Sequence, residues 1–324
     1  WGGEWDANAP EAFKLIDNTE ATTVRTMMSS KELEISDMWQ SSENLKAMDN
    51  LEGVEIALYS PLTKQDLFLN TKREPFDDVN VRKAMACLID YDMVINQLYP
   101  GSPIATSPVP VYVSGHVDNV WPYTYDVEAA KDFLAQSKYA NNIGDYTIEF
   151  ICNSDVADHE KVALAIQSAA QQIGMKIEVS KTPWISLQEL MTQPETTPHL
   201  VTVNNASQFN EAGAILEATY SSKTCGTFEN CTWLQDADYD AKVSAALAEV
   251  DEAKRNAAYA ELQKYLSEEV VASISLGDTL ERAAYQDSYL EWPAAEAAKK
   301  GEYISTLNGY HYYFFDMRVY PDKK

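Results

Sequence analysis

The sequence predicts an α/β protein with more than one structural unit. Along the chain, short segments with strand-like alternation are separated by longer segments whose apolar residues recur at helical spacing. Such strand–helix–strand units usually build a parallel sheet with helices packed on its faces. The chain has 324 residues, and proteins longer than roughly 250 residues usually divide their core between two units.

The N-terminal part of the chain contains the first strand–helix–strand unit. Ala12–Ile16 alternates as a strand, Glu20–Met28 has a helical pattern, and Leu33–Ser36 returns as a strand. Two further segments, Val54–Tyr59 and Asp66–Asn70, are predicted to be extended.

A capped amphipathic helix is predicted after Pro75. Asp77 or Asp78 can accept hydrogen bonds from the free amides of its first turn, where a negative charge also suits the helix dipole. Its apolar stripe consists of Val81, Ala84, Met85 and Leu88, and Arg82 and Lys83 lie off that stripe. Asp90 ends this helix and caps the next, Met93–Leu98.

A second strand–helix–strand unit follows a proline-rich loop over residues 99–122. Tyr146–Ile151 is its first strand and Asp158–Ile173 its helix, and Gly174 ends that helix. Met175, Ile177 and Val179 then alternate as the second strand.

The C-terminal third of the chain is predicted to contain two helices and two strands. These are the helices Asp236–Val250 and Asp251–Glu269 and the strands Val270–Leu276 and Tyr310–Tyr320. The carboxylates of Asp236-Ala-Asp-Tyr-Asp240 imitate the start of a calcium loop. Because Ala241 and Leu247 stand where that loop needs Gly and Glu, helix capping is the better interpretation.

Charge and motif content exclude several functional classes. A net charge of -25 argues against nucleic acid as a partner, since phosphate binding needs clustered Lys and Arg. No apolar run approaches the roughly 20 residues that span a bilayer. The sequence has no nucleophile elbow, phosphate-binding glycine loop or zinc helix, so it predicts no catalytic residue, metal site or cofactor.

Two of the four cysteines bracket a short polar loop. Cys225 and Cys231 are close enough in sequence for a local disulfide if the compartment is oxidising, and we favour that pairing over free thiols. Cys87 and Cys152 are predicted to be small core residues.

The helix after Pro75 also carries a longer ordered pattern. Pro75-Phe-Asp-Asp78, Val81, Arg82, Ala84, Ala86 and Ile89-Asp90 resemble the most recognisable stretch of the extracytoplasmic solute-binding proteins of ABC importers, in family 5, the peptide and nickel-binding type. Tyr125–Leu134 and Arg255–Leu266 resemble further helices of that family. Trp1-Gly2-Gly3 resembles a segment near the middle of full-length members. We therefore expect a fragment or processed form that binds solute more weakly than a longer parent.

The resemblance implies a two-lobed fold of the periplasmic-binding-protein type, class II, with one lobe largely complete and the other only partly present. It places the end of the first lobe and the crossover at residues 1–70, the second, ligand-binding lobe at 71–277, and the return to the first lobe at 278–324. The hinge would consist of Phe68, Leu69, Asn70, Leu276, Gly277 and Asp278.

The resemblance also suggests a ligand-binding segment. In peptide-binding members an Asp in this segment accepts the ammonium of the peptide, and Gln208 stands at that position here. A neutral amide cannot compensate a buried ammonium, which weakens that contact as a hypothesis. The expected ligand-binding residues are Trp184, Asn204, Asn205, Ser207, Gln208, Phe209 and Asn210, with at least one amide capping the helix that begins near Glu211. Trp233 is a further candidate for stacking.

These features predict a non-catalytic receptor that captures a peptide outside the cytoplasm and delivers it to an ABC permease. The resemblance implies a periplasmic or cell-surface location, with membrane association, as in a lipoprotein, only through an anchor missing from this chain. The amide-rich segment keeps an oligosaccharide open as the ligand. A surface interaction module or chaperone without a transport role is a further alternative.

Overall fold

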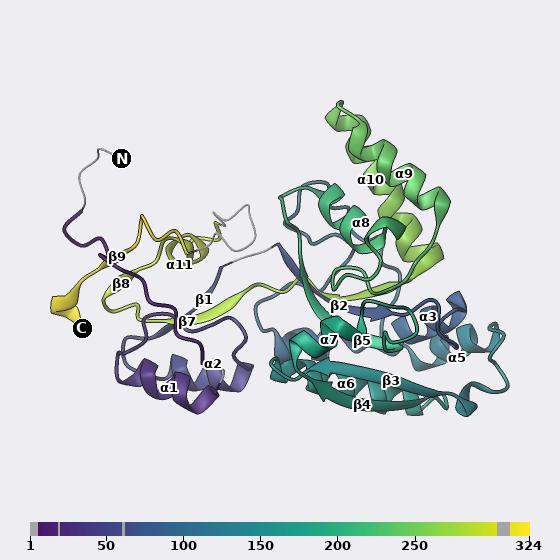
Figure 1. Ribbon diagram of the computed structural model, residues 1–324, viewed down its shortest axis with the longest axis horizontal. Helices are drawn as coiled ribbons and strands as arrows, with labels where there is room; N and C mark the ends of the chain where they lie inside the picture. The colour runs from purple at the N-terminus through teal and green to yellow at the C-terminus, as the bar shows by residue number, and fades with distance from the viewer. Residues whose placement is uncertain (1–5, 19, 60–61, 303–311) are drawn as a thin grey trace. The chain divides into compact units, whose positions relative to one another are not determined.

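The computed structural model describes residues 6–18, 20–59, 62–302 and 312–324. The chain forms two units (Figure 1): unit 1 contains Trp1–Pro61 and Leu280–Lys324, and unit 2 contains Leu62–Thr279. Unit 2 begins at Leu62 and ends at Thr279, because residues 63–69 and 273–277 are strands of this unit. The lobe boundaries that the resemblance places at 70/71 and 277/278 remain a prediction.

Unit 2 is built on a five-stranded mixed sheet in the order β4-β3-β5-β2-β6. Its strands are β2 (Thr63–Leu69), β3 (Thr147–Asn153), β4 (Lys176–Thr182), β5 (Leu200–Ala206) and β6 (Ser273–Gly277). β3 pairs in parallel with β4 and β5, and β2 runs antiparallel to β5 and β6. The predicted parallel strand–helix–strand unit is confirmed as β3, α6 and β4.

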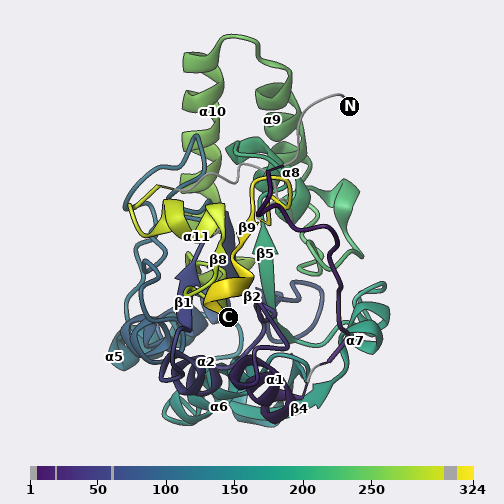
Figure 2. The same cartoon turned by 90° about the vertical axis from the view of Figure 1, so that its left-hand side faces the viewer.

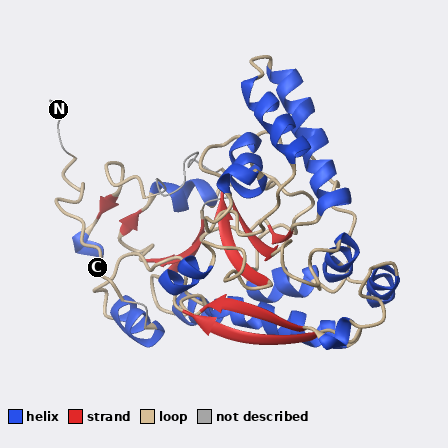
Figure 3. Cartoon of the chain, turned by 45° about the vertical axis from the view of Figure 1, so that its right-hand side comes forward, coloured by secondary structure: helices blue, strands red, loops and turns tan. Residues whose placement is uncertain are grey.

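Helices cover both faces of this sheet (Figure 3). They are α3 (Val79–Ala86), α4 (Tyr91–Met93), α5 (Val127–Ala135), α6 (Ala157–Gln171), α7 (Trp184–Leu190), α8 (Ala212–Tyr220), α9 (Ala237–Ala248) and α10 (Glu252–Tyr265), with π-helical turns at Val94–Leu98 and Leu266–Val270 and 3-10 turns at Ile143–Asp145 and Ser222–Thr224. The main core joins the sheet to α3, α5 and α6. A smaller core on the other face joins β2 and β5 to α7.

Helices α9 and α10 form a hairpin at the end of unit 2 that lies opposite α6 and β4 (Figure 2). Asp236 caps α9 by accepting hydrogen bonds from the amides of Asp238 and Tyr239, both at 3.0 Å. Asp251 caps α10 in the same way. The acidic run at 236–240 is thus a helix cap, as the sequence suggests.

Arg82, which was predicted only to lie off the apolar stripe of the helix after Pro75, is buried and has a structural role. Asp78 caps α3 by accepting from the Asn80 amide, and the predicted apolar stripe is buried. Arg82 is also buried, and its guanidinium donates to the carbonyls of Phe76 at 2.6 Å and Val270 at 2.8 and 2.9 Å. Burial lowers the pKa of Arg82 to about 10. The guanidinium thereby ties α3 to the end of the π-helical turn before β6, a role that its place off the stripe did not indicate.

Unit 1 contains two small antiparallel sheets and three helices among its described residues. β1 (Glu55–Leu58) pairs with β7 (Arg282–Tyr285), and β8 (Leu290–Glu291) pairs with β9 (Arg318–Val319). The helices are α1 (Ala21–Ser29), α2 (Ser42–Asp49) and α11 (Pro293–Ala298), with a final 3-10 turn at Pro321–Lys323.

Three predicted strands of unit 1 are wrong or shorter than expected. Ala12–Ile16 is irregular, because no neighbouring strand supplies hydrogen bonds to it among the described residues. Of Leu33–Ser36 only a single bridge forms, between Ile35 and Tyr285. The predicted strand Tyr310–Tyr320 is reduced to β9, and its first two residues lie outside the described part of the chain.

Within the described ranges, no helix combines the length and the apolar character that crossing a bilayer requires.

Candidate functional site

The carboxyl ends of β3, β4 and β5 meet at one edge of the unit 2 sheet, which we call the carboxyl edge. Because the three strands are parallel, the segments that follow them, beginning at Ser154, Pro183 and Ser207, start along this edge. In open α/β sheets this is where ligands usually bind. The pairing of Thr63 with Ala206, and the 2.9 Å bond from the Ser207 amide to the Leu62 carbonyl, show that unit 2 also begins at this edge.

Two of the predicted ligand-binding residues are joined at the carboxyl edge by a loop that was not predicted to take part. The Trp184 ring packs edge-on against Phe228, with centroids 5.5 Å apart. The Gln208 amide donates a hydrogen bond of 3.1 Å to the Oε1 atom of Glu229. Phe228 and Glu229 belong to the loop 225–231, so that loop brings the segments after β4 and β5 together.

The loop 225–231 is held by its own polar contacts. Asn230 is buried and donates to the carbonyl of Ser221 at 2.8 Å and to the hydroxyl of Thr224 at 3.0 Å. Gly226 has a φ of +87°, and a Cβ there would lie 3.2 Å from the Thr192 carbonyl and 3.3 Å from the Trp233 ring. Only glycine therefore allows the loop to pack this closely.

The predicted disulfide between Cys225 and Cys231 is wrong, because both thiols are free. Cys231 is buried in the apolar cluster with Phe68 and Leu187, whereas the thiol of Cys225 donates to the Leu234 carbonyl at 3.4 Å. Burial raises the pKa of both thiols. Each cysteine thus has a separate environment, and the loop depends on hydrogen bonds for its shape.

Asn205 and Ser207 have structural roles. Asn205 is buried and donates to the Thr219 hydroxyl of α8 at 2.8 Å. The buried Ser207 hydroxyl donates to the Phe209 carbonyl at 2.5 Å. Both side chains are committed to holding the turn between β5 and α8.

The side chains of Asn204 and Asn210 form hydrogen bonds outside the turn between β5 and α8. The Oδ1 atom of Asn204 accepts from Nε2 of His159 on α6 at 3.0 Å, which turns Asn204 away from α7 to the opposite face of the sheet. Burial lowers the pKa of His159 to about 4, so its ring is neutral. Asn210 is exposed and accepts from the amide of Ser114 at 2.9 Å. The expectation that an amide caps α8 is wrong, since its N-cap is Glu211, without a side-chain cap bond.

Of the aromatic candidates, Phe209 is exposed and Trp233 is buried. Phe209 is 60% exposed, directly after Gln208. Trp233 is buried and donates from Nε1 to the Thr197 hydroxyl at 2.8 Å, so it is a core residue. Of the predicted residues, Trp184 and Gln208 thus contact the loop 225–231. Phe209 and Asn210 are exposed in the segment after β5.

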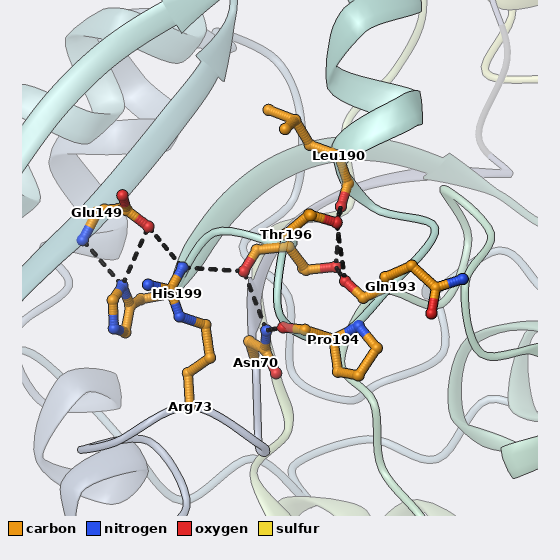
Figure 4. A network of polar contacts seen from close by, with 9 residues as sticks. Asn70, Arg73, Glu149, Leu190, Gln193, Pro194, Thr196 and His199 are labelled. Carbon is orange, nitrogen blue, oxygen red and sulfur yellow. Dashed lines mark hydrogen bonds and ion pairs between the residues drawn. The ribbon is translucent and has the colours of Figure 1, made fainter.

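Three predicted hinge residues, Phe68, Leu69 and Asn70, belong to the interior of unit 2. Phe68 and Leu69 are the last two residues of β2, where they are buried opposite Val201 and Leu200 of β5. Asn70 is buried at the opposite edge of the sheet, where its amide donates to the carbonyls of Pro194 and Thr197 at 2.8 and 3.1 Å (Figure 4). A side chain with these partners anchors the loop 190–199, and the hinge role of these three residues remains a prediction.

The network around Asn70 extends to charged residues (Figure 4). Arg73 pairs with Glu149 and also donates to the Thr197 carbonyl at 3.1 Å. His199 accepts from the Glu149 amide at 3.1 Å, and burial together with the Arg73 guanidinium lowers its pKa to about 4. The network fastens the edge of the sheet that is remote from the carboxyl edge.

The other predicted hinge residues lie at the end of β6. Leu276 is a buried core residue, and a Cβ at Gly277 would overlap the side chain of Ile95. Asp278 is buried, and its Oδ2 atom accepts from the Val111 amide at 2.9 Å. Gly277 therefore serves close packing, and the passage to unit 1 begins only after Thr279.

Phe228 and Glu229 are the site residues that the sequence did not reveal. Their loop attracted attention only through its flanking cysteines, and nothing in its pattern pairs it with Gln208 or Trp184.

In the part of the chain that the structure describes, no group of three His, Cys, Asp or Glu side chains could hold a metal ion.

Comparison with known proteins gives a consistent result. The family described as bacterial extracellular solute-binding proteins, family 5 (middle), matches residues 5–226. "Heme-binding protein A" of Haemophilus influenzae is 24% identical over 196 residues, which are 60% of this chain and 35% of the relative. The periplasmic oligopeptide-binding protein OppA of Escherichia coli is 25% identical over 209 residues, or 62% and 37% of the two chains.

A solved structure shares the fold. The periplasmic binding protein DppA of Helicobacter pylori, in complex with the peptide STSA, superimposes with a TM-score of 0.76 at 18% identity, over 94% of this chain and 55% of that one. The chain thus spans well under half the length of the two curated relatives above.

Proposed function

Because the chain belongs to family 5 of the bacterial extracellular solute-binding proteins, we propose that it is a solute-binding receptor of an ABC importer and that its solute is a peptide. The match over residues 5–226 carries this proposal. Support for a peptide comes from relatives and fold neighbours whose names include oligopeptide-binding and dipeptide-binding proteins.

In this proposal the carboxyl edge of unit 2 supplies a wall of the solute site. Trp184 and Phe228 offer aromatic surface, and Gln208 and Glu229 offer a donor and acceptors for a peptide backbone. Ile185, which follows Trp184 in sequence, is 72% exposed and adds apolar surface. Phe209, which follows Gln208, is 60% exposed and adds more. A few polar groups among apolar side chains are typical of small-solute sites.

The solute is released unchanged in this proposal, and the receptor works outside the cytoplasm and delivers the solute to a membrane permease. The catalytic motifs sought in the sequence are missing. Solute binding is also the function that the family name describes.

Calorimetry on the full chain tests the proposal. The chain is titrated with a pool of random tripeptides and, separately, with a pool of oligosaccharides, and both pools are recovered and weighed by mass spectrometry. We expect saturable heat from the peptides and unchanged masses. Heat from the oligosaccharides alone would replace peptide by sugar as the solute, and hydrolysis of either pool would overturn the receptor proposal. A chain that ignores both pools but captures a protein would instead be an interaction module.

A further inference from the structure

One irregular segment of unit 2 reaches from the end of β6 to the carboxyl edge. Residues 107–118, which we call the strap, contain no helix or strand. Within the strap, the Ser114 amide donates to Oδ1 of Asn210 at 2.9 Å, and the Ser114 carbonyl accepts from the Ala212 amide at 2.8 Å. The packing is close, since a Cβ at Gly115 would lie 2.9 Å from the Cβ of Ala212. The strap therefore shapes the segment that follows β5.

The first half of the strap is held by β2 and by the residue after β6. Oδ2 of Asp278 accepts from the Val111 amide at 2.9 Å, and Lys64 donates to the Pro108 carbonyl at 2.6 Å. Pro108 and Pro110 have no amide hydrogen, so this part of the strap offers few donors. Displacement of Asp278 would thus free the middle of the strap.

The carboxyl group of Asp278 lacks a cation that could compensate its charge. It is 1% exposed, and its Oδ1 atom has no hydrogen-bond partner in the part of the chain that the structure describes. The charged or titratable groups that face it are Lys64 and Asp66 of β2 and His116 of the strap. Lys64 is already paired with Asp66 at 3.1 Å, and the His116 ring bonds within the strap, to a carbonyl at 2.7 Å.

The chain on the other side of Asp278 is uncharged. The Pro103 carbonyl accepts from the Asp278 amide at 3.0 Å, and the segment 99–106 around it contains no Asp, Glu, Lys, Arg or His. Burial raises the pKa of Asp278 to about 7. The packed strap therefore retains a proton that a solvated carboxyl loses at about pH 4.

We propose that the protonated form of Asp278 holds the strap in place, and that loss of this proton releases the strap and weakens solute binding at the carboxyl edge. The inference rests on the proposed function, because it concerns the regulation of the same edge. A carboxylate that ionises without a compensating cation is stabilised by water, which enters when the strap opens. A solute that meets the segment after β5 then finds fewer binding-competent molecules.

Hydrogen–deuterium exchange resolved to single amides tests the release in the full chain. The rates at Val111 and Ser114 are compared at about pH 6 and about pH 8, each divided by the rate of an unstructured peptide at the same pH. The opening constant rises about tenfold over this range for a carboxyl that titrates near pH 7 when packed and near pH 4 when solvated. We expect that loss of protection in the parent and in Asp145→Asn, which changes an exposed carboxylate, and no loss in Asp278→Asn.

The variant His116→Gln separates the carboxyl from the imidazole, since an imidazole can titrate in the same range. Gln keeps a donor for the strap carbonyl, so the loss of protection should persist in this variant. A loss that survives Asp278→Asn and disappears in His116→Gln would overturn the role of Asp278. Equal protection of the parent at both pH values would do the same.

Calorimetry with a pool of random tripeptides tests the link to the solute. Between about pH 6 and about pH 8 we expect the affinity of the parent to fall, relative to Asp278→Asn, by up to about tenfold. An affinity that stays constant while the strap is released would overturn the link. If the pool binds at neither pH while the strap is released, the proposed function fails and the control of the strap by Asp278 stands on the exchange data.

Discussion

Lys64 and Asp66 form an ion pair in β2 that no solvent reaches. The Nζ atom of Lys64 lies 3.1 Å from Oδ2 of Asp66, and both side chains are 0% exposed. Lys64 also donates to the Pro108 carbonyl at 2.6 Å, and Asp66 accepts from the Ser275 hydroxyl at 3.0 Å. Burial acts to lower the pKa of Lys64, but the attraction of Asp66 raises it overall, so Lys64 remains charged.

Changing one member of this pair should cost far more than changing both. Lys64→Met leaves the Asp66 carboxylate buried without compensation, which typically costs about 3–5 kcal/mol. Asp66→Asn keeps an acceptor for the Ser275 hydroxyl but leaves the Lys64 ammonium without an anion, beside only the Pro108 carbonyl and the Tyr220 ring, at a similar cost. The double variant contains no buried charge, so we expect it to be more stable than the sum of the single losses by about 2–3 kcal/mol.

Urea unfolding followed by tryptophan fluorescence measures these differences. The four proteins of the cycle are compared at neutral pH, with the slope of the transition used to check that each unfolds in the same manner. Losses that simply add, or a Lys64→Met variant within about 0.5 kcal/mol of the parent, would show that the pair is not desolvated as described.

Two further predictions concern the end of β6. Burial raises the pKa of Asp278 to about 7. The native state therefore holds a proton that the unfolded chain loses from about pH 4 upward, and the stability from this group declines between about pH 4 and pH 7, by up to about 4 kcal/mol. Asp278→Asn should remove that part of the pH dependence of unfolding. Gly277→Ala should lose about 1–3 kcal/mol by overlap with Ile95, and adding Ile95→Val should recover part of the loss in urea unfolding.

Two substitutions away from this strand end provide controls for these two measurements. Asp145→Asn changes an exposed carboxylate of the same unit and should leave the pH dependence unchanged. Gly144→Ala meets only the Gly174 carbonyl, at 3.4 Å, and should cost less than Gly277→Ala. A pH profile that Asp278→Asn does not alter, or a Gly277→Ala loss that Ile95→Val deepens, would contradict the packing described for this strand end.

Regular elements were predictable where local signals agreed. Asp78, Asp236 and Asp251 each cap the helix that the sequence assigned to them. The unit formed by β3, α6 and β4 combines alternation, helical spacing and a glycine stop in the expected order. Strands that depend on distant partners were harder, because β7 pairs with β1 across more than two hundred residues and Ala12–Ile16 has no partner among the described residues.

The candidate site was predictable only in part, because some of its residues come together from segments that are distant in sequence. Trp184 stood out as an aromatic residue that could stack on a ligand, and Gln208 stood out because its segment resembles the ligand-binding segment of the family. Phe228 and Glu229 come from a loop beyond α8, and only the fold shows that it returns to the same edge. Asn205 and Ser207 have the composition of ligand-binding residues, but burial commits them to the backbone and to Thr219.

Hydrogen–deuterium exchange of the full chain with a saturating random tripeptide pool tests the central claim most directly. We predict slower exchange in residues 204–210 and 225–231 at the carboxyl edge, no change in the loop 190–199 at the opposite edge, and peptides recovered at their original masses. Protection confined to the loop 190–199 or to unit 1, or shortened peptides in the recovered pool, would contradict the assignment of this edge as a binding site that releases its solute intact.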